Sequence, residues 1–447
     1  MDKKRIATLF LIVLMDTAGA TAIVPLIPVY VLAQFHATPF QAGLLLAVYY
    51  AAQVLAAPWL GKLSDRFGRR PILLLSQAGT IVSYLLIVFA IPLGALLDHA
   101  GLPLGVAGGL VVIFLARILD GVTGGNVSVA QAYASDISTP EERTRALGLV
   151  GGAFGLGFIL GPALVGLLAL LAPTTLVAPL LGAALVSGVT LLLTLLWLRE
   201  PLRRKDGKDM DAQPAKGVPL AQVLRSFPVL LVLGIALLMT SYMAALAGTF
   251  SMYSSRVLFA GQPADVVVRN VGLIMTVLGL VQVLAQVFLL KPLVSRLGER
   301  KLVLLGSLLQ LVSAVGLFTV SELGAVIVFV VVFALGYGIS SPTLQSLMTR
   351  FGPEQMAGRL LGVFQSVSSV AFILSMLWGT YVFDYVSPRA VFAVSAVLLA
   401  LAVVGSVGII RYKPTREAAG SIGSLVETTT DMAPTIQLES GHLTELN

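Results

Sequence analysis

Long apolar runs alternate with short polar or charged segments along most of the 447 residues of the chain. Each run is about 20 residues or longer, which is the length that an α-helix needs to cross a membrane. The runs lack the every-second-residue alternation of membrane β-strands, so they are predicted to be transmembrane helices. There are twelve such runs. They cover residues 6–32, 40–60, 72–92, 104–133, 145–171, 175–198, 226–253, 268–290, 302–320, 324–348, 359–382 and 390–410.

One polar interruption, residues 199–219, is longer than the others and combines many charges with proline and glycine. It is predicted to be a cytoplasmic linker between two six-helix bundles, residues 1–198 and 220–410. The polar segment 411–447 is predicted to be a disordered cytoplasmic tail. The predicted fold is therefore all-α and polytopic, with twelve transmembrane helices in two pseudo-symmetric bundles.

Composition supports a membrane protein, because 57% of the residues are hydrophobic and 11% are charged, against about 25% charged in soluble domains. Of the 29 lysines and arginines, 25 fall in the termini, the linker and the loops of one side, and three fall in the opposite loops. This asymmetry predicts that both termini are cytoplasmic, in an inner or plasma membrane. The net charge of +7 is thus a signal of topology and does not indicate nucleic-acid binding.

The chain has no cysteine, and its three histidines, His36, His99 and His442, fall in predicted loops or in the tail. A metal site within the membrane is therefore not expected. An intramembrane enzyme would need a nucleophile and a base, or metal ligands, at depth. We expect neither enzymatic activity nor a cofactor, and we expect a monomer.

A dense basic segment, residues 61–71, separates the second and third runs and is predicted to be a short loop at the membrane surface. Its residues Gly61, Asp65, Arg66, Gly68, Arg69 and Arg70 follow the pattern Gly-x3-Asp-Arg-x-Gly-Arg-Arg. This pattern resembles the signature loop between helices 2 and 3 of the major facilitator superfamily. The alternative is a basic topology anchor that happens to contain two glycines.

A weaker copy of this segment lies 230 residues further on, where Arg296, Gly298 and Arg300 match Arg66, Gly68 and Arg70. An internal repeat at half length is typical of transporters built from two bundles, with the transport cavity at their interface. The resemblance also implies a cytoplasmic latch of the outward-open state. In it, Asp65 docks on the start of span 11 near Gly358, and Arg69 pairs with Asp136 at the end of span 4.

Span 4 contains Arg117 near its midpoint, where a buried cation needs a nearby anion. Asp120 lies one helical turn away, and Asp16 lies at a similar depth in span 1. The surrounding residues resemble an Arg-x-x-x-Gly element of proton-coupled superfamily members, although the family usually has glutamine or a small residue at the position of Asp120. We expect Asp16, Arg117 and Asp120 to couple transport to protons, with Asp16 as the carrier; a purely structural ion pair is the alternative.

Span 5 contains a glycine pattern, formed by Gly148, Gly157, Gly161, Pro162 and Gly166. It resembles the motif of drug antiporters, except that Val165 replaces one glycine. Ordinary helix packing is the alternative, because small residues at four-residue spacing let helices approach closely. Together the motifs resemble the tetracycline/proton antiporter branch of the drug/proton antiporter family. However, Ser83 stands where tetracycline exporters have an acid.

The second-half spans contain no acid. Neutral polar residues are the candidates for the substrate cavity: Asn126, Tyr242, Tyr337, Gln345 and Gln365. Such groups suit hydrophobic or amphipathic molecules, and we expect neutral or monocationic compounds to be favoured over dications.

The predicted function is proton-coupled export of such hydrophobic or amphipathic molecules, with small molecules, protons and membrane lipids as partners. A lipid or glycolipid flippase on the same fold is the main alternative, and a sensor that does not transport is another.

Overall fold

The computed structural model describes residues 3–100, 107–124, 126–139, 142–171, 177–201, 223–351 and 356–412. Most of the predicted linker and nearly all of the predicted tail lie outside this described part. Within it, twelve helical segments are long and apolar enough to cross a membrane. The predicted fold, twelve membrane-spanning helices in two bundles, is confirmed.

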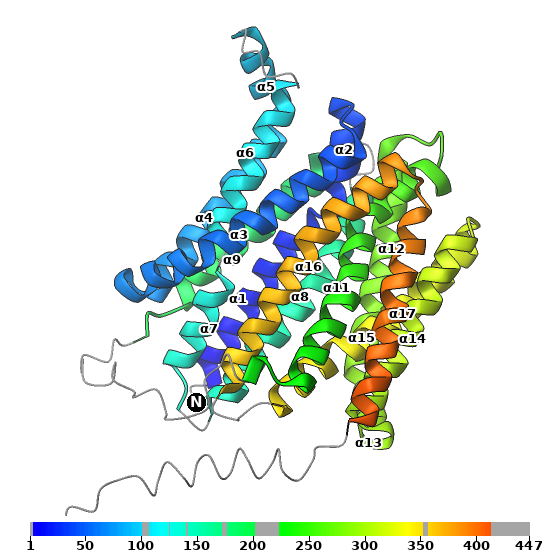
Figure 1. Ribbon diagram of the computed structural model, residues 1–447. Helices are drawn as coiled ribbons and strands as arrows, with labels where there is room; N and C mark the ends of the chain where they lie inside the picture. The colour runs from blue at the N-terminus through cyan, green and yellow to red at the C-terminus, as the bar shows by residue number, and fades with distance from the viewer. Residues whose placement is uncertain are drawn as a thin grey trace, which may run out of the picture.

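The first bundle contains the blue, cyan and blue-green helices of Figure 1. They are α1 (Lys3–Ala22), α2 (Leu26–Phe35), α3 (Pro39–Phe67), α4 (Arg69–Val88), α5 (Ala90–His99), α6 (Gly108–Thr123), α7 (Val127–Asp136), α8 (Arg143–Leu171) and α9 (Val177–Trp197). Span 1 consists of α1 and α2, and span 4 consists of α6 and α7.

The second bundle contains the green to red helices. They are α11 (Phe227–Tyr253), η1 (Ser254–Leu258), α12 (Ala264–Leu284), η2 (Ala285–Leu289), α13 (Leu290–Leu297), α14 (Glu299–Thr319), α15 (Leu323–Arg350), α16 (Ala357–Tyr385) and α17 (Ala390–Arg411). The two π-helical turns, η1 and η2, continue spans 7 and 8. The start of α1 and the end of α17 lie at the same end of the molecule (Figure 1).

Two symmetry-related helix pairs join the bundles. Helix α8 of span 5 packs along α12 of span 8, and α3 of span 2 packs along α16 of span 11. Both pairs combine a helix from each half of the chain, as expected for an internal repeat. The interface between the bundles is therefore formed by spans 2, 5, 8 and 11.

The basic segment 61–71 differs from its predicted form. Helix α3 continues to Phe67 and α4 begins at Arg69, so Gly68 alone separates them. Arginine and lysine are good helix formers, and a helix end at the membrane surface lets their charges reach water. The weaker copy is built in the same way, because Gly298 alone separates α13 from α14. Both glycines have positive φ, +104° at Gly68 and +75° at Gly298.

Spans 1 and 4 were predicted as continuous helices, and both are interrupted. In span 1 the break falls at residues 23–25, where Pro25 lacks the N–H that a continuous helix would use. In span 4 the break lies between Thr123 and Val127 and includes Gly124. Helix breaks at mid-depth are common where transporters bind substrates or ions.

Candidate functional site

A cavity lies between the bundles, lined by α3, α7 and α8 on one side and by α11, α12, α15 and α16 on the other. It encloses about 1390 Å³, including the part that opens to solvent. At the end of the bundles where α3 begins, the backbone N–H of Phe40 donates to Asp384 Oδ2 at 3.4 Å. There Thr380 also fills the space beside Gly43. At the opposite end, a Cβ atom at Gly148 near the start of α8 would have no neighbour within 4 Å among the described residues. In the described part of the chain the cavity is therefore open on the side where α1 begins.

The structure places three of the five predicted cavity residues in this lining: Tyr337, Gln345 and Gln365. Tyr242 lies elsewhere. It is fully buried within the second bundle, and its hydroxyl is 2.9 Å from Ser313 Oγ. Its neighbour Met243 lines the cavity instead, because successive residues of a helix point in different directions.

The fifth predicted cavity residue, Asn126, lies just before α7 and does not belong to the lining. Its side-chain amide donates to Asp16 Oδ2 at 2.6 Å. Asn126 is therefore placed with the predicted proton-coupling residues. Asp16 itself is half-buried in α1.

Arg117 and Asp120 form a buried ion pair in α6. Arg117 Nη1 donates to Asp120 Oδ2 at 2.7 Å, and the two side chains are 0% and 1% exposed. Thr80 of α4 donates to the other carboxylate oxygen at 2.8 Å. The guanidinium carbon lies 4.3 Å from the centre of the Tyr49 ring, an arrangement in which the ring face attracts the cation. No ion pair within 4.0 Å joins Arg117 to Asp16 in the described part of the chain.

Gln53 connects the cavity to this ion pair. Its side chain lines the cavity, and its Nε2 donates to Gly124 O at 2.8 Å and to the Tyr49 hydroxyl at 3.3 Å. The ring of Tyr49 covers Arg117. A molecule that binds Gln53 thus contacts a residue that is separated from Arg117 by one side chain, Tyr49.

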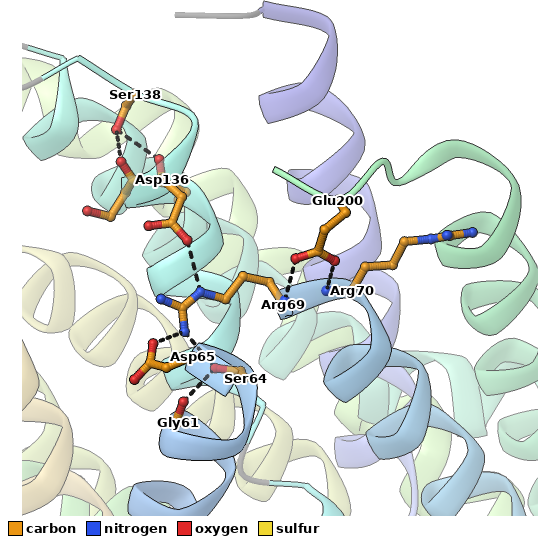
Figure 2. Close-up of polar contacts among 10 residues, drawn as sticks. Gly61, Ser64, Asp65, Arg69, Arg70, Asp136, Ser138 and Glu200 are labelled. Atoms are coloured by element: carbon orange, nitrogen blue, oxygen red, sulfur yellow. Dashed lines mark hydrogen bonds and ion pairs between the residues drawn. The ribbon is translucent and has the colours of Figure 1, made fainter. Parts of the chain in front are cut away.

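The basic segment forms a compact polar cluster with the end of span 4 (Figure 2). Arg69 Nε donates to Asp136 Oδ2 at 2.9 Å, and Arg69 Nη1 lies 2.5 Å from Asp65 Oδ1. The contact between Arg69 and Asp136 that the resemblance implies is therefore present. The expected docking of Asp65 involves the start of α16 next to residues 352–355, which lie outside the described part, so it stays a prediction.

Glu200 is a member of this cluster that sequence reasoning assigned to the linker. Its two carboxylate oxygens accept from the backbone N–H groups of Arg69 at 2.6 Å and Arg70 at 2.8 Å (Figure 2). A carboxylate at a helix N-terminus is stabilising, by about 0.3–1 kcal/mol at exposed sites. The Arg70 side chain donates to Leu195 O at 2.5 Å. The end of span 6 is thus attached to the start of span 3.

Comparison with known proteins identifies the family. The model of the Major Facilitator Superfamily matches residues 9–264 and 265–434. The chain belongs to this superfamily. It is 30% identical to the class B tetracycline resistance protein of Escherichia coli over 382 residues, which cover 84% of this chain and 88% of that protein.

A second relative and a solved structure are also similar to the chain. Multidrug resistance protein 2 of Bacillus subtilis (strain 168) is 26% identical over 388 residues, covering 84% of this chain and 89% of that protein. The crystal structure of a D-xylose-proton symporter superposes with a TM-score of 0.68 at 14% identity, covering 92% of this chain and 98% of the other. That last likeness concerns the fold alone.

The glycines of the span 5 pattern lie on two different surfaces of α8 in this superfamily member. At Gly157 and Gly161 a Cβ atom would lie within 2.6 Å of backbone oxygens of α1, so these glycines allow α8 and α1 to pack closely. Gly148 instead faces the cavity. Pro162 lies within α8, and the surroundings of Gly166 lie outside the described part of the chain.

Replacing Gly68 in the superfamily signature segment is expected to destabilise the protein. Its φ of +104° and ψ of +159° belong to a region that is essentially limited to glycine, and a side chain there costs about 1–3 kcal/mol. A Cβ atom would also lie 2.8 Å from Glu200 Oε1. We therefore expect Gly68→Ala to lower the unfolding temperature of the purified protein, measured by intrinsic tryptophan fluorescence.

The matched control is Gly61→Ala. Gly61 lies within α3, and a Cβ atom there would have no neighbour within 4 Å. This variant is expected to unfold at the wild-type temperature. Equal shifts of the unfolding temperature in both variants would show that the positive φ of Gly68 is not the cause of the destabilisation.

Proposed function

We propose that the protein exports small hydrophobic or amphipathic molecules in exchange for protons, by alternating access. The main observation in support is that the cavity between the bundles is lined by neutral groups, whereas the half-buried Asp16 and the buried Asp120 do not belong to the lining. A neutral lining suits an amphipathic substrate, and a carboxylate that is partly shielded from bulk water suits proton binding. The names of the relatives, tetracycline and multidrug resistance proteins, point in the same direction.

In the proposed cycle Asp16 is the proton carrier. Asp120 is engaged by Arg117 and Thr80, whereas the hydrogen-bond partner of Asp16 is the neutral Asn126. Asp16 can therefore change its protonation without breaking an ion pair. Asn126 stands at the break of span 4, so a change at Asp16 acts on the junction between α6 and α7.

The substrate acts on the same region through Gln53 and Tyr49, which connect the cavity to Arg117. Gln53 contacts Tyr49, Tyr49 contacts Arg117, and Arg117 is paired with Asp120. Occupancy of the cavity and the state of the Arg117–Asp120 pair therefore influence one another. We propose that this contact couples the two fluxes. In the outward-open state the cytoplasmic latch would close, with Asp65 docked on the start of α16.

The cellular arrangement is part of the proposal. The asymmetric distribution of lysine and arginine supports cytoplasmic termini, so the open end of the cavity in this structure faces the cytoplasm. We propose a multi-pass protein of the inner or plasma membrane that acts as a monomer and uses the proton gradient without a further cofactor.

Transport in proteoliposomes with an acidic interior tests the function against the flippase alternative. The probes are radiolabelled chloramphenicol, a neutral amphipathic drug, and a phosphatidylethanolamine with a fluorescent head group. We expect gradient-dependent accumulation of chloramphenicol, and lipid movement no faster than in protein-free vesicles. Accelerated lipid movement without drug accumulation would instead establish the flippase.

A further inference from the structure

Six glutamine side chains line the cavity, and they come from both bundles: Gln53, Gln131, Gln282, Gln286, Gln345 and Gln365. The lining contains no aspartate, glutamate, lysine, arginine or histidine among the described residues. A carboxamide is uncharged, yet it offers two donor hydrogens and an acceptor oxygen. The cavity is thus rich in hydrogen-bonding capacity without carrying charge.

Gln282 differs from the other five because it is completely buried. Its exposure is 0%, and neither Oε1 nor Nε2 has a hydrogen-bond partner in the described part of the chain. Buried polar groups are normally satisfied, so an unpartnered amide at a cavity wall is a group that a ligand can satisfy. The other five are half-buried.

Gln282 lies beside apolar side chains, so a ligand could place a polar group at its amide and an apolar group next to it. Gln282 also lines a small second pocket with Val24, Met243, Met275 and Leu278. That pocket is almost entirely apolar. Gln282 therefore lies between the cavity and this apolar pocket, where a polar group of a ligand would stand next to a hydrocarbon surface.

We infer that the cavity selects uncharged molecules that carry several hydroxyl, carbonyl or amide groups on an apolar frame, and that Gln282 determines this selectivity. This inference rests on the proposed transport function and narrows its substrate class. A cation in the cavity would lose its water without gaining a counter-ion. A pure hydrocarbon would displace water from the amides without replacing its hydrogen bonds.

The test uses two steroids with the same ring frame, and a lipophilic cation. Cortisol has three hydroxyl groups that progesterone lacks, and both are uncharged; the cation is tetraphenylphosphonium. Binding to the purified full-length protein is measured by equilibrium dialysis. We expect cortisol to bind more tightly than progesterone and than the cation.

The variants are Gln282→Leu and the matched control Gln77→Leu. Gln77 of α4 is 1% exposed and its amide is likewise unpartnered in the described chain, but it does not line the cavity. Both changes remove an unsatisfied buried amide and roughly keep side-chain volume, so both proteins are expected to fold.

Gln282→Leu should weaken cortisol binding about tenfold, as expected for the loss of a hydrogen bond, and leave the binding of progesterone unchanged. Gln77→Leu should change neither.

The inference is overturned if wild type fails to bind cortisol, if progesterone or the cation binds as tightly, or if the two variants behave alike. Its failure can be distinguished from failure of the transport function. Gradient-driven uptake of tetraphenylphosphonium without a preference for cortisol would refute the inference and leave transport intact. Selective cortisol binding without gradient-driven uptake of any probe would refute the proposed function and leave the inference intact.

Discussion

The Asp16→Asn variant is expected to lose gradient-driven export while it still binds substrate. Asparagine has nearly the same shape as aspartate, so the contact with Asn126 and the packing of α1 are largely kept. It cannot take up or release a proton near neutral pH, and the variant therefore has no carrier for the coupled flux. In proteoliposomes with an acidic interior, chloramphenicol accumulation should fall to the level of empty vesicles. Exchange of labelled for unlabelled drug without a gradient should continue.

Asp265→Asn is the control for this experiment. Asp265 lies in the first turn of α12, away from the cavity lining and from the buried acids. This variant is expected to accumulate chloramphenicol as wild type does. If Asp16→Asn also retains accumulation against the gradient, Asp16 is not the obligatory carrier, and Asp120 or a proton-independent mechanism must replace it.

The Arg117→Leu variant is expected to be strongly destabilised, because it leaves the Asp120 carboxylate buried without its cation. Both side chains are at most 1% exposed, and removing one partner of a buried pair costs about 3–5 kcal/mol. Tryptophan fluorescence during heating of the detergent-solubilised protein measures this loss.

The double variant Arg117→Leu/Asp120→Asn separates stability from function. It removes the unpaired charge, so most of the unfolding temperature should be recovered. Gradient-driven export should remain impaired, because Tyr49 no longer contacts a cation. A double variant that unfolds as early as Arg117→Leu would show that the charge of Asp120 is not the source of the instability.

Much of the fold could be predicted from the sequence, because a membrane span has a minimum apolar length and charges mark its ends. The helices nevertheless extend past the apolar runs, as α3 does to Phe67, since hydropathy locates lipid contact and not the end of helical hydrogen bonding. The glycine repeat at Gly68 and Gly298 correctly indicated two related halves. Its helical setting was missed because charged segments resemble loops in a hydropathy pattern.

The site was only partly predictable for a geometric reason. The sequence places a residue at a depth in the membrane, but it does not fix how each helix is rotated about its axis. Tyr242 was therefore expected in the cavity that Met243 lines, and Gln282 was missed although an amide in an apolar span was a usable signal. Glu200 was missed because its partners are backbone N–H groups, which no sequence pattern reveals.

Proton movement driven by substrate tests the central claim most directly. Wild-type protein is reconstituted in vesicles that enclose a pH-sensitive dye and have an acidic interior, and chloramphenicol is added outside. We predict that the drug accelerates the rise of internal pH beyond the leak of protein-free vesicles, and that Asp16→Asn abolishes this acceleration. Accumulation of the drug with no accompanying proton movement, or at the same level without a pH gradient, would contradict proton-coupled export.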